Sequence, residues 1–154
     1  MMKQYIFVLF FLFTNYLSSA QELTWFTNAN EAVKKSNSQN KPLLMFFTGS
    51  DWCGWCIRLQ KEVFSQPEFK QWAIENVVLL ELDFPRRSQQ EESLKNQNAQ
   101  ILNVFGVRGY PTIWIVKPTL NSDKVNFDPL GSIGYIAGGP NTWIESANKI
   151  LIKK

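Results

Sequence analysis

The sequence has 154 residues, of which 45% are hydrophobic, carries a formal net charge of +3 and contains no histidine. This length suits one domain with a proper core but not two, and the weak, scattered positive charge gives no support for a nucleic-acid partner. Without histidine the chain lacks the commonest metal ligand and the usual base near neutral pH, so its chemistry must use cysteine, carboxylate, lysine or backbone groups.

Residues 1–20 have the pattern of a secretory signal peptide. Lys3 is their only charged residue, the run 5–17 is almost wholly apolar, and Ala20 ends a group of small residues suited to signal cleavage. The apolar run is shorter than the ~20 residues of a membrane-spanning helix. We expect cleavage after Ala20, which leaves residues 21–154 as a single exported domain with 15 of the 16 basic residues against 13 acidic ones. An uncleaved N-terminal anchor is the alternative, and either way the domain lies outside the cytoplasm, most simply in the periplasm.

The rest of the chain alternates between apolar spacings typical of strands and of helices. In the first half of the chain we expect a short strand or arm at 23–26, a helix at 31–38, a buried strand at 43–47, helices at 52–64 and 68–75, and a buried strand at 77–82. In the second half we expect a polar loop at 85–98 leading into a helix that ends near 105–106, a strand at 112–116, a turn-rich stretch at 117–128, and a last helix that begins at 140–142. An antiparallel pair of 125–127 with 133–136 would close the edge of the sheet. This order predicts an α/β fold with a central mixed β-sheet and helices on both faces.

The segment 52–56 (WCGWC) contains the only two cysteines, Cys53 and Cys56. A bridge between them would close a loop of only four residues and stabilise little, and a structural zinc site would need two further ligands, from a second chain. If Cys53 begins the following helix, the helix end lowers its pKa, and Cys56 lies one turn further along the same face. The spacing therefore favours thiol-disulfide exchange, with an inert bridge and a shared metal as the alternatives.

Two segments resemble those of the thioredoxin-like superfamily. Residues 48–56 (TGSDWCGWC) follow a buried strand and are similar to the active-site segment of exported bacterial members, and residues 107–112 (VRGYPT) are similar to the loop with the family's cis-proline. The resemblance covers about residues 23–152. It implies a thioredoxin-like fold and an exported thiol-disulfide oxidoreductase, with Cys53 as the nucleophile, Cys56 as the resolving thiol, and neither a cofactor nor a metal.

The resemblance also implies where a substrate would bind. Pro111 would be the cis-proline that faces the cysteines, and the backbone of Tyr110 would pair with an extended substrate segment. Trp52 would form part of an apolar rim around the exposed sulfur, and Trp55 lies between the cysteines, where relatives often have proline or histidine. Asp51, two residues before the nucleophile, is interpreted as a helix cap or a solvated loop acid.

The sequence departs from ordinary thioredoxins in the proton relay beneath the cysteines. Phe46 or Phe47 stands where the family has a buried acid in the central strand, and Leu79 lies near the position of the lysine on the neighbouring strand. Glu81 and Asp83 are the candidates for a substitute acid, although strand alternation sends both to the same face, where they would be exposed to solvent.

The direction of electron transfer depends on how well the reduced pair is stabilised. Because Trp55 replaces histidine, no imidazolium assists the thiolate, and we expect a disulfide reductase or electron carrier acting on protein thiols or disulfides. In an oxidising compartment it would need a membrane thiol transporter or another thioredoxin-like protein as electron donor. A binding or chaperone-like module with a redox-inactive CxxC disulfide, using Trp52, Trp55 and Tyr110, is the second functional class.

Overall fold

The computed structural model describes residues 23–121 and 124–152, so the expected signal peptide lies outside the described residues. The elements are β1 (Trp25–Phe26), α1 (Ala29–Gln39), β2 (Leu43–Thr48), α2 (Gly54–Leu59), the π-helical turn η1 (Gln60–Phe64), α3 (Pro67–Asn76), β3 (Val78–Asp83), α4 (Glu92–Phe105), β4 (Thr112–Asn121), β5 (Lys124–Ile133) and α5 (Gly139–Ile152). In the part of the chain that is described, no helix is both long and apolar enough to cross a membrane.

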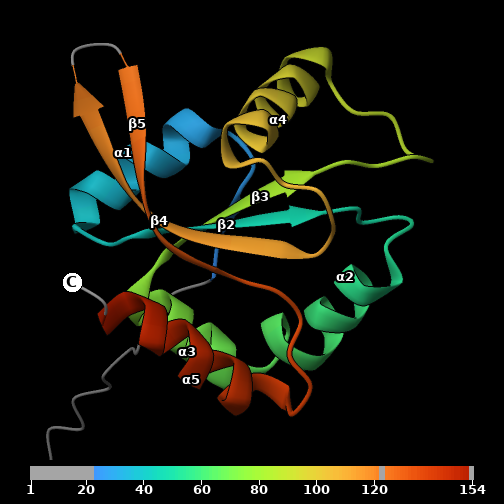
Figure 1. Ribbon diagram of the computed structural model, residues 1–154, viewed down its shortest axis with the longest axis vertical. Helices are drawn as coiled ribbons and strands as arrows, with labels where there is room; N and C mark the ends of the chain where they lie inside the picture. Colours follow the sequence, from blue (N-terminus) through green and yellow to red (C-terminus); the bar gives the residue numbers. More distant parts are fainter. Residues whose placement is uncertain (1–22, 122–123, 153–154) are drawn as a thin grey trace, which may run out of the picture.

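The five strands form one mixed sheet in the order β1-β3-β2-β4-β5 (Figure 1). β1, β3 and β2 run parallel to one another, whereas β4 lies antiparallel to β2, and β5 antiparallel to β4. The parallel strands end on the side of the sheet where α2 begins, so the loops that follow β2 and β3 meet there.

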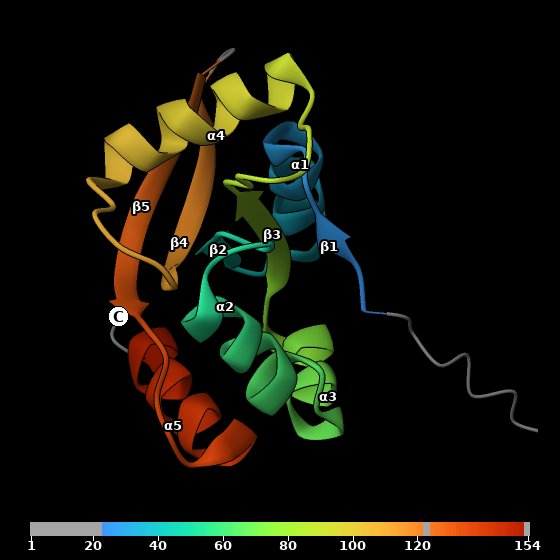
Figure 2. The ribbon, with the colours of Figure 1, turned by 90° about the vertical axis from the view of Figure 1, so that its right-hand side faces the viewer.

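The central strand β2 is buried along its whole length because helices cover both faces of the sheet. Leu44 and Phe46 point to one face, and Leu43, Met45 and Phe47 point to the other. On the first face β2 packs against α2, α3 and α5, and on the second against α1 and α4 (Figure 2). The apolar side chains of β2 therefore contribute to two separate hydrophobic clusters, one on each face of the sheet. One of these clusters contains the cysteines.

Capping residues set the helix boundaries that the sequence predicts. Asn28 caps α1 by accepting the backbone N–H of Glu31, and Pro67 begins α3, where a missing N–H costs no hydrogen bond. α4 ends at Gly106, which has a φ of 58° that glycine adopts without strain. The expected mixed α/β sheet with helices on both faces is confirmed.

The predicted pairing of 125–127 with 133–136 is wrong, because both 125–127 and Ile133 belong to the single long strand β5. β5 pairs with β4, which extends well past the expected end at Val116. Pro129 and Gly131 lie within this strand, and the chain accommodates them by a register shift between Ile115 and Val116. A proline is tolerated at a bulge on an edge strand because it removes no needed ladder hydrogen bond.

Candidate active site

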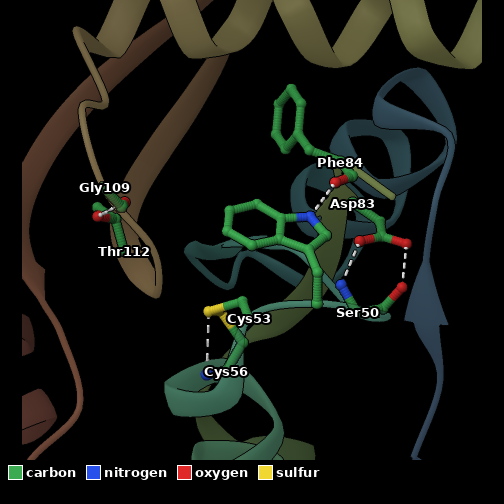
Figure 3. The surroundings of a disulfide bond; sticks show 8 residues. Ser50, Cys53, Cys56, Asp83, Phe84, Gly109 and Thr112 are labelled. Carbon is green, nitrogen blue, oxygen red and sulfur yellow. Dashed lines mark hydrogen bonds between the residues drawn. A yellow bond between two sulfur atoms is a disulfide. The ribbon is translucent and has the colours of Figure 1, made fainter. Parts of the chain in front are cut away.

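The cysteine pair lies where the loop after β2 enters α2 (Figure 3). Cys53 is the N-cap of α2, and its Sγ accepts the backbone N–H of Cys56 at 3.2 Å. The two sulfurs form a disulfide, and Cys53 is 6% exposed while Cys56 is 1% exposed. The positive end of the helix favours a thiolate on Cys53 once the disulfide is reduced. The geometry suits an outer nucleophile backed by an inner resolving thiol.

Trp52 forms one wall beside the cysteines. Its Nε1–H donates to the carbonyl oxygen of Phe84 at 2.7 Å, and Gly49 packs so closely against the indole that a Cβ there would come within 3.0 Å of the ring. The indole meets the ring of Tyr110 edge to face at 5.6 Å, and Tyr110 also packs against Phe84 at 5.4 Å. The Tyr110–Pro111 peptide bond is cis, as the resemblance implies. Three of the four expected substrate-binding residues therefore lie together.

Trp55 is 56% exposed and its contacts are with other residues than those of Trp52 and Tyr110. Its ring lies 5.2 Å from that of Tyr135, and the Arg58 guanidinium sits over both rings, at 5.5 and 5.4 Å from their centroids. Glu62 joins this group by accepting from Arg58 Nε at 2.7 Å and from the Tyr135 hydroxyl at 2.5 Å. These hydrogen bonds, from Tyr135 first and Arg58 second, lower the pKa of Glu62, while the same bond to Glu62 raises the pKa of Tyr135. We call these four residues the Trp55 cluster.

The interpretation of Asp51 as a helix cap is wrong, because Cys53 itself occupies that position. The Asp51 carboxylate instead binds the loop after β3, accepting the backbone N–H groups of Arg86, Arg87 and Ser88 at 2.7 to 2.9 Å. These hydrogen bonds, led by that of Arg86, lower the pKa of Asp51 to about 2. The residue is therefore an anchor that ties two active-site loops together.

Glu81 and Asp83, the two acids expected to substitute for the proton relay, differ from each other in their contacts. Phe46 is registered with Glu81 on β3, so the neighbour opposite the aromatic residue is a carboxylate and not Leu79, which pairs with Leu44. Asp83 accepts the backbone N–H and the hydroxyl of Ser50 at 2.8 and 2.5 Å, as Figure 3 shows. Burial, and secondarily the charge of Asp83, raise the pKa of Glu81. Within the described residues these acids build no group of three or more ligands suited to a metal ion.

The sequence motifs did not single out four residues of this region: Arg58, Glu62, Tyr135 and Arg86. The spacing of Trp55, Arg58 and Glu62 by three and four residues was a detectable signal, since such positions share a helix face. Tyr135 joins them from the distant segment after β5, and no local pattern points to that contact. Arg86 looked like an ordinary loop residue, yet its guanidinium stacks on Trp52 at 3.5 Å from the ring centroid.

Comparison with known families identifies the class of protein. Residues 24–118, more than half of the chain, match the family model described as thioredoxin-like. The chain therefore belongs to the thioredoxin-like family. Together with the paired cysteines at the start of α2, this membership makes it a thiol-disulfide oxidoreductase.

Individual relatives narrow the comparison further. The chain is 33% identical over 120 residues to the disulfide bond reductase DsbH of Chlamydia pneumoniae, an alignment that covers 77% of this chain and 72% of DsbH. It is 29% identical over 119 residues to the thioredoxin-related protein DsbJ of the same organism, covering 77% of this chain but only 33% of DsbJ. A solved structure of a DsbH oxidoreductase superimposes with a TM-score of 0.74 at 28% identity, covering 86% of this chain and 87% of that one. The expected thioredoxin-like fold is confirmed.

Proposed function

We propose that this oxidoreductase reduces disulfides of exported proteins, with Cys53 as the nucleophile and Cys56 as the resolving thiol. The observation that carries the proposal is the position of Cys53 as the helix cap, with its sulfur accepting the backbone N–H of its partner Cys56. This arrangement stabilises the negative charge that the outer sulfur bears as attacking and as leaving group. The reductive direction is supported by the similarity to a named disulfide reductase and by Trp55, which provides no imidazolium between the cysteines.

The reaction proceeds by two exchanges of sulfur partners. The Cys53 thiolate attacks one sulfur of the substrate disulfide, forms a mixed disulfide with it, and releases the other substrate sulfur as a thiolate that takes up a proton. Cys56 then loses its proton and attacks Cys53, which releases the second substrate thiol and leaves the enzyme as the disulfide of this structure. Two electrons have passed to the substrate, and an external dithiol must return them.

The walls around the cysteines support the binding of an extended polypeptide. The Tyr110–Pro111 bond is cis and the Tyr110 ring packs against Trp52, and we propose that a substrate strand adds to the Tyr110 backbone by main-chain hydrogen bonds. Trp55 offers an exposed aromatic surface on the helix that carries the cysteines. In this proposal Trp52, Trp55, Tyr110 and Pro111 hold the substrate, and the cysteines react.

The proposed location is an exported compartment, the periplasm, reached through the signal sequence of residues 1–20. Such a compartment is oxidising, so the reduced enzyme needs a steady supply of electrons. A membrane thiol transporter, or another thioredoxin-like protein that draws on one, is the proposed donor. The named relatives of the Dsb type support this assignment.

The proposal is tested by trapping substrates on Cys53 with the Cys56→Ser variant in the native compartment. Without the resolving thiol the mixed disulfide persists, so substrate proteins accumulate as adducts that a reductant releases. Cys53→Ser is the matched control and should trap none. Absence of adducts would contradict the exchange reaction, and a redox potential well above about −150 mV would contradict its reductive direction.

A binding module is the second candidate function, and the observation in its favour is the exposure of Trp55 and Ile57, at 56% and 51%, beside the cysteines. Binding by such a surface does not need the sulfurs. The Cys53→Ser variant would then protect an unfolded client from aggregation as well as the unmodified protein does, whereas an oxidoreductase with no separate binding activity would show no protection in either form.

A further inference from the structure

Every arginine of the chain lies in a segment that borders the cysteine pair, whereas the lysines are spread over the other elements. Arg58 belongs to α2, Arg86 and Arg87 to the loop after β3, and Arg108 to the loop that leads into Pro111. Arginine differs from lysine in presenting a planar fork of donors that matches a carboxylate in two-point hydrogen bonding. Their placement therefore suggests recognition of an anion at this surface.

The arginines differ in whether their charge is already matched. Arg58 forms an ion pair with Glu62 at 2.7 Å, so its charge is largely compensated within the Trp55 cluster. Across residues 23–121 and 124–152, the other ion pair joins Lys95 to Glu92. The Arg86 guanidinium thus has no carboxylate partner in the described part of the chain.

Arg86 also contacts a residue next to the cysteine pair. Its guanidinium lies face-on over Trp52, 3.5 Å from the ring centroid, and Trp52 immediately precedes Cys53 in the chain. Burial raises the pKa of Tyr110 and the positive charge of Arg86 opposes that rise, so the guanidinium lies within electrostatic range of the proposed substrate strand. Stacking occupies one face of the guanidinium and leaves the N–H groups at its edge available.

The backbone beneath Arg86 is fixed before any substrate arrives. Asp51 accepts the N–H of Arg86 at 2.9 Å and those of Arg87 and Ser88, which fastens the loop to the turn in front of the cysteines. The carboxylate that lies nearest in the sequence to the nucleophile is thereby occupied by backbone donors. A side chain carried on an anchored backbone loses less entropy when it binds, so Arg86 is prepared for a ligand.

We propose that Arg86 is a specificity-determining residue that binds a carboxylate next to the substrate cysteine, so the preferred substrates are disulfides flanked by aspartate or glutamate. This inference rests on the proposed function and names its substrate class. An extended segment paired with Tyr110 passes Trp52, and an acidic side chain near its cysteine then reaches the guanidinium edge.

The test compares three peptides that share one intramolecular disulfide and carry glutamate, glutamine or lysine beside a cysteine. The rate constant for oxidation of the reduced full-length protein by each peptide is measured and divided by the rate of the same peptide with a small neutral dithiol, which removes intrinsic differences in the disulfides. We expect the glutamate peptide to react roughly threefold or more faster than the glutamine peptide in about 10 mM salt, and the lysine peptide to react slowest. The ratio of the normalised rate constants of the glutamate and glutamine peptides should fall towards one in about 1 M salt, because the Debye length there is only about 3 Å.

Two variants of Arg86 test whether this residue causes the preference for the glutamate peptide. Arg86→Gln should abolish the preference for glutamate over glutamine, and Arg86→Lys should keep only part of it, since lysine lacks the planar fork. Arg87→Gln is the matched control: it removes the same charge one residue away, from a side chain that makes no ring contact or ion pair among the described residues, and it should keep the preference.

The outcomes distinguish a failure of the carboxylate preference from a failure of the proposed disulfide reduction. If the unmodified protein reduces none of the peptides, the proposed function fails. If it reduces all three at equal normalised rates, the function stands and the carboxylate preference is overturned. If Arg87→Gln weakens the preference as much as Arg86→Gln does, a diffuse positive field and not the stacked arginine selects the substrate, which also overturns the assignment.

Discussion

Asp51 and Glu81 are two carboxylates of the active-site region with opposite electrostatic surroundings. Asp51 receives three backbone N–H groups, which stabilise its charged form, whereas Glu81 is largely withdrawn from water and faces the charge of Asp83. The pKa of the first is therefore lowered and that of the second raised. At the scale of single residues, the two should change the stability of the protein with pH in opposite directions.

Asp51→Asn should destabilise the protein at neutral pH and loosen the Arg86 loop. Because the pKa of Asp51 is about 2 in the folded state and 3.8 ordinarily, its stabilising contribution is complete above 3.8 and is lost as the pH falls towards 2. The difference in unfolding temperature between the variant and the unmodified protein should thus shrink between about pH 4 and about pH 2. Asp128→Asn, a change on the exposed edge of β5, is the control. A pH-independent difference would show that the carboxylate charge is not what anchors the loop.

Glu81→Gln should have the reverse effect and stabilise the protein at neutral pH. Since burial raises the folded-state pKa above 4.5, the ionised side chain opposes folding above that pKa, and the penalty disappears below 4.5, where both states are protonated. Urea unfolding should therefore show a higher free energy for the glutamine variant at about pH 7 and equal values at about pH 3.5. Glu145→Gln, on the exposed side of α5, should change little at either pH. A variant less stable than the original at neutral pH would reveal a stabilising partner of the carboxylate.

At the scale of an element, the turn between β2 and α2 sets the position of Cys53. The N–H groups of Trp52 and Cys53 both donate to the carbonyl of Gly49, at 3.2 and 2.8 Å, and Ser50 is fastened to Asp83. The missing side chain at Gly49 lets the indole of Trp52 lie directly against the backbone. The turn at Gly49 and Ser50, the indole of Trp52 and the helix cap Cys53 therefore pack together as one unit.

Gly49→Ala should damage that unit while Gly54→Ala should not. A Cβ at position 49 would overlap the Trp52 ring, and such overpacking costs about 1–3 kcal/mol of unfolding free energy. A Cβ at position 54 meets nothing within 4 Å, and alanine there should raise helix stability by up to about 1 kcal/mol. Denaturant unfolding of both variants, with tryptophan fluorescence as the signal, measures the difference. Equal stabilities would mean that the indole has room to shift.

At the scale of the whole molecule, an aromatic core supports the helix that carries the cysteines. Trp143 of α5 is fully buried, donates its Nε1–H to the carbonyl of Gly134 at 3.1 Å, and packs at ring distances of 5.3 and 5.6 Å against Phe64 and Phe69. Phe64 in turn contacts Phe46 of the central strand at 5.1 Å. The C-terminal helix thereby buttresses the layer beneath the active site.

Two tryptophan substitutions should separate stability from activity. Trp143→Ala removes a fully buried ring and should cost about 3–5 kcal/mol of unfolding free energy. Trp55→Ala removes a ring that is 56% exposed and should change stability by no more than about 0.5 kcal/mol, while slowing reduction of a protein disulfide. Urea unfolding and an exchange assay on the same samples compare the two. An unchanged exchange rate in Trp55→Ala would contradict a role for Trp55 in substrate binding.

The parts predicted from sequence are those governed by local pattern. Apolar runs and cap residues located the buried strands and helix ends, and the motifs around Cys53 and Pro111 implied the fold and the cis bond that the structure contains. Contacts between distant loops left no local trace, which is why the anchoring role of Asp51 was missed. The predicted antiparallel pair failed because local apolar pattern marks a strand but not its partner, and only the register with β4 shows that 125–127 and Ile133 belong to one irregular strand.

β5 forms one edge of the sheet, and no other strand of the described residues covers the outer side of its backbone. Open edges of this kind invite further chains and lead to polymers, and Pro129 at the bulge works against such addition by removing a donor and interrupting the ladder. The proposed substrates are extended segments, and such segments could also pair with an open edge of the sheet. The irregular edge therefore disfavours self-association along β5, and in the proposed function the cis-proline loop is the place where a substrate strand adds.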